Sequence, residues 1–156
     1  AFLSGVPLST PNHWRYVAWR EALDRHGLPV NPDLIVDGLP SARTDEAEGM
    51  RAAEILMERG AAFTAVYALN DLMALGTIRA LHNRGLRVPE DVSVVGCDRL
   101  KILQSITPTL ATMDIRGFEV GRFLMRSLIS KIAGRSEEPL TVSVDFVMGE
   151  SVASIL

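Results

Sequence analysis

One strand–helix–strand unit in the middle of the sequence constrains the fold more than any other feature. An apolar run, Ala65–Ala68, leads to Asn70 and a helix predicted over residues 72–84, and a second apolar run, Val92–Val95, leads to Asp98. Two parallel strands joined by one helix place polar residues at neighbouring carboxyl ends, where open α/β sheets bind small ligands. We therefore expect a binding site at this edge of the sheet.

The rest of the sequence extends this alternation of strands and helices. Before the central unit, Gly and Pro residues delimit a strand at 1–3, a helix at 12–26, a strand at 34–36 and a helix at 47–60. After it come an extended connection at 106–112, an amphipathic helix at 117–133 and an edge strand at 140–148. This order predicts an α/β fold whose parallel sheet is flanked by helices.

Composition restricts the class of protein. The 156 residues are 47% hydrophobic and 22% charged, which is typical of a globular domain that buries a core. The net charge is −3 and no basic run occurs, so direct DNA binding by this chain is not expected. No apolar stretch reaches membrane-spanning length, so no membrane partner is expected. The single cysteine, Cys97, excludes an internal disulfide and suits a reducing, cytoplasmic location.

The sequence contains no arrangement of residues typical of an enzyme. The three histidines, His13, His26 and His82, are isolated and lack metal-binding spacing. The Gly-Lys-Ser/Thr phosphate loop and the Gly-x-Ser-x-Gly elbow are both absent. Cys97 has no neighbouring base and reads as a small buried hydrophobic residue. We predict no enzymatic activity, no catalytic residue, no metal and no cofactor.

Two stretches of the central unit carry a family resemblance. Residues 65–76, AVYALNDLMALG, and residues 85–98, GLRVPEDVSVVGCD, resemble the effector-binding region of LacI-type (lactose and purine repressor-like) transcriptional regulators. The similarity continues at 3–23 and 107–121 and covers residues 1–151. It implies one lobe of a periplasmic-binding-protein-like (type I) fold. It also implies a small-molecule effector, usually a sugar, held between two lobes.

The resemblance further implies a division of the chain into three segments. Residues 1–112 would form the C-terminal lobe of the effector-binding domain, and residues 140–156 the final strand and tail. Residues 113–139 would form a crossover and a helix that belongs to the N-terminal lobe in an intact protein. Most of that lobe and a DNA-reading head would be missing, so DNA contact would require a segment that this chain lacks. The apolar helix face is predicted to pack back on its own sheet or to swap between chains.

The resemblance assigns ligand contacts to particular residues. Arg15 matches a position whose guanidinium binds the hydroxyls or the carboxylate of the effector. Asn70 matches an Asn that contacts the effector, and Asp98 matches an Asp that accepts hydrogen bonds from its hydroxyls. These groups suit a sugar, because vicinal hydroxyls pair well with a fork of donors and a carboxylate. Trp14 is a further candidate, since an aromatic ring can stack on a sugar face.

Each candidate also has a structural interpretation, and the alternatives stay open at this point. Arg15 has the alternative of a solvated helix face, and Asn70 that of a helix N-cap. Asp98 has the alternative of a turn residue, and Trp14 that of an aromatic residue in the core.

Two neighbouring residues bear on the same site. Asp71 is expected to cap the helix that follows it. Arg99 occupies a position where the family often has a second acidic residue. Its positive charge near the site would suit an anionic effector.

Three functional classes follow from these observations. The leading one is the effector-sensing portion of a LacI-type regulator, which forms a homodimer through residues 100–106 and the helix after Asn70. The alternative is a fragment of a secreted sugar-binding protein that feeds an ABC transporter. The third is an enzyme on a similar α/β frame.

Overall fold

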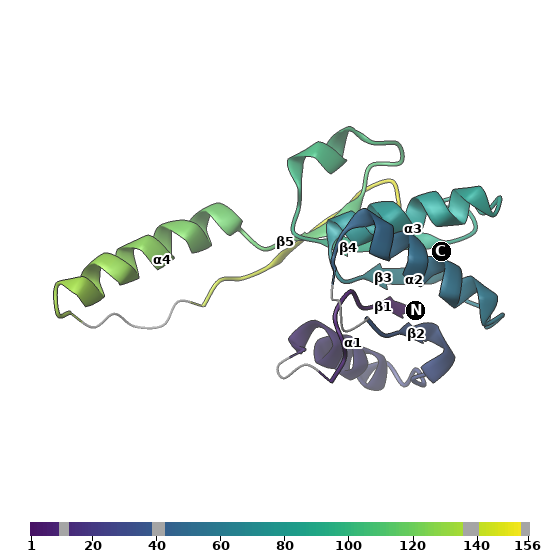
Figure 1. The fold of residues 1–156 in the computed structure, drawn as a ribbon, viewed down its shortest axis with the longest axis horizontal. Coiled ribbons are helices and arrows are strands. Elements are labelled where there is room, and N and C mark those ends of the chain that lie inside the picture. The colour runs from purple at the N-terminus through teal and green to yellow at the C-terminus, as the bar shows by residue number, and fades with distance from the viewer. Residues whose placement is uncertain (10–12, 39–42, 136–140, 154–156) are drawn as a thin grey trace.

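The structure, a computed structural model, describes residues 1–9, 13–38, 43–135 and 141–153. Within these residues six strands form one sheet in the order β2-β1-β3-β4-β5-β6, and Figure 1 shows helices packed on it. The strands are β1 (Phe2–Leu3), β2 (Ile35–Val36), β3 (Ala65–Ala68), β4 (Ser93–Cys97), β5 (Ala111–Asp114) and β6 (Asp145–Val147). The α-helices are α1 (Trp14–Arg25), α2 (Glu46–Glu58), α3 (Asp71–Asn83) and α4 (Gly117–Ile132), and the 3-10 helices are η1 (Pro32–Leu34) and η2 (Lys101–Ser105).

The strand directions match the predicted fold class. Neighbouring strands from β2 to β5 are parallel, and only β6 pairs in the antiparallel sense, with β5. The predicted edge strand thus lies at the edge of the sheet, although it is shorter than expected. The α/β prediction of a parallel sheet flanked by helices is confirmed.

Helices α2 and α3 pack against each other and cover one face of the sheet. Their backbones approach so closely at Gly49 and Gly76 that an added Cβ would collide with main-chain atoms of the other helix, at Met73 and Glu46 respectively. Alternate strand residues such as Val66 point to this side and are fully buried, as the two-residue period of a strand requires. This layer contains most of the hydrophobic core.

The opposite face of the sheet is covered by α1 only near β1. Phe2 and Tyr67 are register partners on adjacent parallel strands, so their side chains point to the same face. The ring of Phe2 contacts those of Tyr16 and Trp19 on α1, with centroid distances of 5.4 and 5.5 Å. An aromatic cluster therefore attaches α1 to the sheet, while β4 and β5 extend beyond it.

Helix α4 stands apart from the sheet at the end of an arm that continues from β5, as Figure 1 shows. None of its residues is buried, and its apolar side includes Phe118, which is 79% exposed. The expectation that this helix packs back on its own sheet is wrong, because α4 lies away from the sheet and none of its residues is buried. Exchange of the helix between chains stays a prediction.

The expected cap of α3 also needs correction. Asn70, not Asp71, is the N-cap residue, and its side-chain Oδ1 accepts a hydrogen bond from the Met73 amide at 2.9 Å. Asp71 is 1% exposed, and its carboxylate points away from the helix end into the sheet layer. The physical reason is position: the residue in extended conformation before the first helical turn makes the cap, and here that residue is Asn70.

Candidate functional site

The carboxyl ends of β3 and β4 form a polar rim on which three predicted ligand residues converge. Asn70 follows β3 and Asp98 follows β4, and these two strands are adjacent and parallel. Arg15 reaches the rim from the first turn of α1. Its Nη1 donates to the Leu69 carbonyl at 3.0 Å and its Nη2 donates to Asp98 Oδ1 at 3.2 Å. The structure thus brings Arg15 and Asp98 into direct contact.

Asp98 lies on a turn with unusual backbone geometry. Its φ is 123° and that of Arg99 is 57°, a region that L-residues rarely occupy. Burial raises the pKa of the Asp98 carboxyl above its ordinary value, the positive charge of Arg15 opposes this shift, and the negative charge of Asp71 adds to it. The carboxyl is nevertheless accessible, since its side chain is 27% exposed. It can therefore accept hydrogen bonds from a ligand.

Asn70 is already engaged by the protein on both ends of its amide. Its Oδ1 caps α3, and its Nδ2 donates to the Thr44 carbonyl at 2.8 Å. The side chain is half-buried, and an amide nitrogen carries a second hydrogen that a ligand can use. The capping interpretation is correct, and the ligand role of Asn70 stays a prediction.

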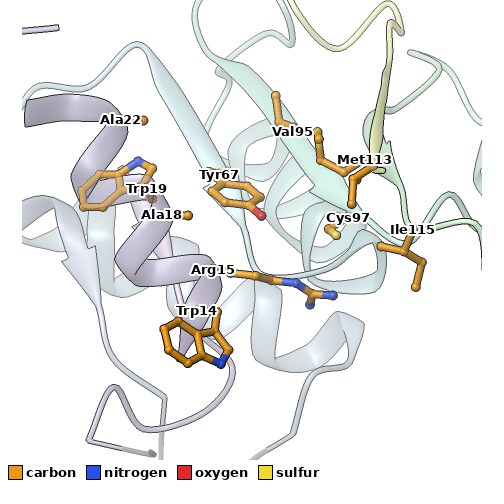
Figure 2. Close-up of a pocket in the computed structure, with 11 residues that line it drawn as sticks. Trp14, Arg15, Ala18, Trp19, Ala22, Tyr67, Val95, Cys97, Met113 and Ile115 are labelled. Carbon is orange, nitrogen blue, oxygen red and sulfur yellow. The ribbon is translucent and has the colours of Figure 1, made fainter. Parts of the chain in front are cut away.

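A cavity of about 600 Å³ lies beside Arg15 on the sheet face that α1 leaves open. Its walls are mainly apolar and include Tyr67, Val95 and Met113 from three neighbouring strands. Figure 2 shows Arg15 extending from α1 toward Cys97, while Trp14 lies one residue earlier on the same helix. Trp14 is 68% exposed and lines this cavity, so the core interpretation of Trp14 is wrong for the structure described. Its stacking role stays a prediction.

A second cavity of about 550 Å³ lies on the other side of Asp98 and is lined by charged groups. Arg99 pairs with Asp114 at 2.5 Å, and Arg116 pairs with Asp145 at 2.7 Å. The charged residues that line this cavity are three acidic and three basic ones: Asp98, Asp114 and Glu119, and Arg99, Lys101 and Arg116. The Arg15–Asp98 pair lies between the two cavities, because Arg15 lines the first and Asp98 the second.

Three features of the site were missed by sequence reasoning. Tyr67 lines the apolar cavity, and burial raises the pKa of its hydroxyl to about 12. Side chains alternate between the two faces along β3, so Tyr67 points to the face opposite to that of Val66. Strand periodicity could therefore have identified Tyr67 as a residue of this face. The Asp71 carboxylate accepts a hydrogen bond from the Thr112 hydroxyl on β5. No sequence signal links these two residues, nor Arg116 with Asp145, because each pair is joined only by the fold.

The described residues, 1–9, 13–38, 43–135 and 141–153, offer neither a metal site nor a membrane span. They contain no group of three or more His, Cys, Asp or Glu residues that could hold a metal ion. They also contain no helix that is both long enough and apolar enough to cross a membrane.

Comparison with known proteins identifies the fold family. The model of the periplasmic binding protein-like domain matches residues 1–152. The chain belongs to the periplasmic binding protein-like domain family. This confirms the lobe-type fold expected from residues 65–98.

Individual relatives of this periplasmic binding protein-like domain are LacI-type regulators. It is 37% identical over 139 residues to the HTH-type transcriptional regulator AscG of Escherichia coli, covering 89% of this chain and 40% of that protein. A solved sugar-binding transcriptional regulator of the LacI family from Escherichia coli, complexed with phosphate, has a TM-score of 0.84 and 35% identity. That match covers 97% of this chain and 54% of the solved one. A complex of the transcriptional regulator CelR with cellobiose has a TM-score of 0.79 and 32% identity, over 88% and 41% of the two chains.

These matches confirm the resemblance to LacI-type regulators. The relatives are transcriptional regulators and repressors. The chain spans about half the length of the relatives that it matches, or less.

The single thiol of this periplasmic binding protein-like domain gives a prediction that depends on pH. Burial raises the pKa of the Cys97 thiol from its ordinary value near 9.0 to about 11, so at pH 8 the thiolate is about 100-fold scarcer in the folded chain than in the unfolded one. We expect iodoacetamide to modify the folded chain about 100-fold more slowly than the urea-unfolded chain. Mass spectrometry of timed samples measures both rates.

The same shift has a consequence for stability. Because the folded state holds the thiol proton more tightly, the contribution of Cys97 to the free energy of unfolding falls as the pH rises above about 9. Equal alkylation rates in the folded and unfolded states would contradict the burial of this thiol.

Proposed function

We propose that this chain is the effector-sensing portion of a LacI-type transcriptional regulator. It binds a small polyhydroxyl metabolite, a sugar or sugar derivative, and thereby controls DNA binding by an N-terminal head that the 156 residues do not include. The observation that carries this proposal is the contact between Arg15 and Asp98 at the carboxyl ends of β3 and β4. A guanidinium and an accessible carboxylate at this edge form a donor and acceptor pair that suits vicinal hydroxyls.

The charges around the site favour a neutral effector over an anionic one. Arg99 was the reason to consider an anion, but its guanidinium already pairs with Asp114. The cavity beside Asp98 is lined by basic and acidic groups in balance, so it offers both donors and acceptors without a net positive field. Among the relatives, one regulator is in complex with cellobiose and another with lactose, which agrees with a neutral sugar, whereas a third is complexed with phosphate.

The division of the chain follows from the same proposal. Residues 1–112 form one lobe, residues 113–139 belong with a second lobe in the intact protein, and residues 140–156 return as the final strand and tail. The isolation of α4 from the sheet and the exposure of its apolar side support this division. Half of a two-lobed cleft is expected to bind its effector weakly, because the second wall of the site is absent.

A thermal-shift screen with neutral sugars, sugar acids and sugar phosphates tests the proposed function. The 156-residue chain and a full-length protein that contains it are screened side by side at millimolar ligand. We expect neutral sugars to raise the melting temperature of the longer protein more than that of the short chain, since the stabilisation of the folded state by a ligand grows with the logarithm of its concentration divided by Kd. The absence of any sugar hit with both proteins would overturn the sensor proposal, and hits confined to sugar phosphates would overturn the neutral class.

Homodimerisation is part of the proposal and has its own test. The expected contacts are α3 and the segment 100–106, where Ile102 is an exposed apolar side chain. We expect Ile102→Glu to weaken the dimer at least 10-fold in sedimentation velocity, whereas Ile132→Glu on α4 leaves it unchanged. The reverse result would contradict this interface and favour exchange of α4 between chains.

The alternative of a secreted sugar-binding protein is not favoured. The relatives reported above are transcriptional regulators, and no observation on this chain points to a transporter.

A further inference from the structure

Asp71 is a buried acid that the proposed contacts with an effector do not use. Its side chain is 1% exposed and lies against the backbone of β4, so that a Cβ added at Gly96 would be 2.5 Å from its Oδ1. Placing a carboxylate in such an environment is costly unless its oxygens are well satisfied by hydrogen bonds. The two partners of Asp71 therefore indicate its role.

Both partners of Asp71 belong to the segments that shape the Asp98 turn. Oδ2 accepts a hydrogen bond from the Leu100 amide at 2.7 Å, directly after the turn. Oδ1 accepts from the Thr112 hydroxyl on β5 at 2.5 Å. The same Thr112 oxygen accepts from the Arg99 amide at 3.3 Å. Asp71 thus holds Leu100 directly and Arg99 through one intervening hydroxyl.

The turn needs such support because its backbone is strained. Asp98 and Arg99 are consecutive non-glycine residues with positive φ. Strained residues of this kind persist only where surrounding contacts enforce them, and they cluster at ligand sites. In this backbone conformation the Asp98 side chain contacts Arg15, and the Asp98 amide donates to the Met113 carbonyl at 3.0 Å.

We propose that Asp71 is a positioning residue, whose buried carboxylate holds the Asp98–Arg99 turn in the conformation that presents Asp98 to the effector. It also connects the turn to β5, the strand that leads into the arm carrying α4. A change at Asp98 upon binding can therefore reach the arm through Thr112. The presentation of Asp98 to an effector rests on the proposed function. The support of the turn by Asp71 does not depend on any ligand.

The primary test is amide hydrogen exchange measured by NMR on the ligand-free chain. Asp71→Ala removes both acceptors, so we expect exchange at Leu100 to accelerate at least 10-fold. Asp71→Asn keeps a carbonyl oxygen for Leu100 and an amide that can donate to Thr112, so exchange should return to within about threefold of the original. Thr77→Val is the matched control, because the buried Thr77 hydroxyl on the same helix donates only to the Met73 carbonyl.

A carboxyl titration by ¹³C NMR separates positioning from general destabilisation. Removing the Asp71 charge should lower the pKa of Asp98 in both Asp71 variants, because that charge contributes to raising it. Thr77→Val should leave this pKa unchanged even if it reduces stability equally. Unchanged Leu100 exchange in Asp71→Ala, or equal acceleration in Thr77→Val, overturns the inference.

Two further experiments cover the remaining outcomes. If Asp71→Ala does not fold, Thr112→Val removes the intervening hydroxyl while preserving side-chain shape, and it should accelerate exchange at Arg99; unchanged exchange there overturns the inference. Titration of the unmodified chain with cellobiose and lactose tests the function separately. Faster Leu100 exchange in Asp71→Ala, with no sugar bound by either the short chain or the full-length protein, upholds the positioning role and counts against the sensor proposal alone.

Discussion

Replacing Phe2 by alanine is expected to lower the free energy of unfolding by about 3–5 kcal/mol. Phe2 is fully buried in the short central strand β1, and its ring contacts those of Tyr16, Trp19 and Tyr67. The substitution removes the contacts that attach α1 to the sheet and leaves a cavity that the strand backbone cannot close. Urea unfolding followed by circular dichroism measures the change as a shift in midpoint at constant slope.

Phe118→Ala is the matched control for this prediction. The same side chain on α4 is 79% exposed, so its removal should change stability by no more than about 0.5 kcal/mol. Where Phe2→Ala is too unstable to study, Phe2→Leu gives a smaller loss in the same direction. Equal effects of the Phe2 and Phe118 substitutions would contradict the described core.

The second large effect concerns effector binding. Asp98→Asn and Arg15→Ala are each expected to weaken binding of a sugar effector by about 10- to 100-fold, since hydrogen bonds to charged groups contribute about 1.5–3 kcal/mol each. Asn is chosen at position 98 because it keeps the shape of the side chain and removes its charge. Isothermal titration with the best ligand from the thermal-shift screen measures the affinities.

Asp91→Asn is the control for the binding experiment. Asp91 pairs with Arg87 in the loop before β4, at the opposite end of that strand from Asp98. This substitution should leave the affinity unchanged.

The affinity for the effector should also depend on pH. Because burial raises the pKa of Asp98, its carboxylate is protonated at a higher pH than an ordinary aspartate, and binding should weaken there as the pH falls. Ligand binding that survives both Asp98→Asn and Arg15→Ala would reject the assignment of the site.

The sequence by itself determined the central strand–helix–strand unit and the edge that carries the site. Strand β3 has the predicted bounds, Ala65–Ala68, and Asn70 and Asp98 lie at adjacent carboxyl ends. These features were predictable because apolar periodicity, capping residues and glycine stops act within a few residues of one another. The parallel arrangement then follows from the single helix that connects the two strands.

Only the tertiary structure decided which side chains meet at that edge. Arg15 and Asp98 are 83 residues apart in the sequence, and Asp71 and Thr112 are 41 apart, yet each pair is in hydrogen-bond contact. The partners of the Asp71 carboxylate, Thr112 and Leu100, likewise come from other segments of the fold, whereas the cap at Asn70 follows locally from the start of α3 at Asp71. Such pairs are set by strand order and register, which local patterns in the chain do not encode.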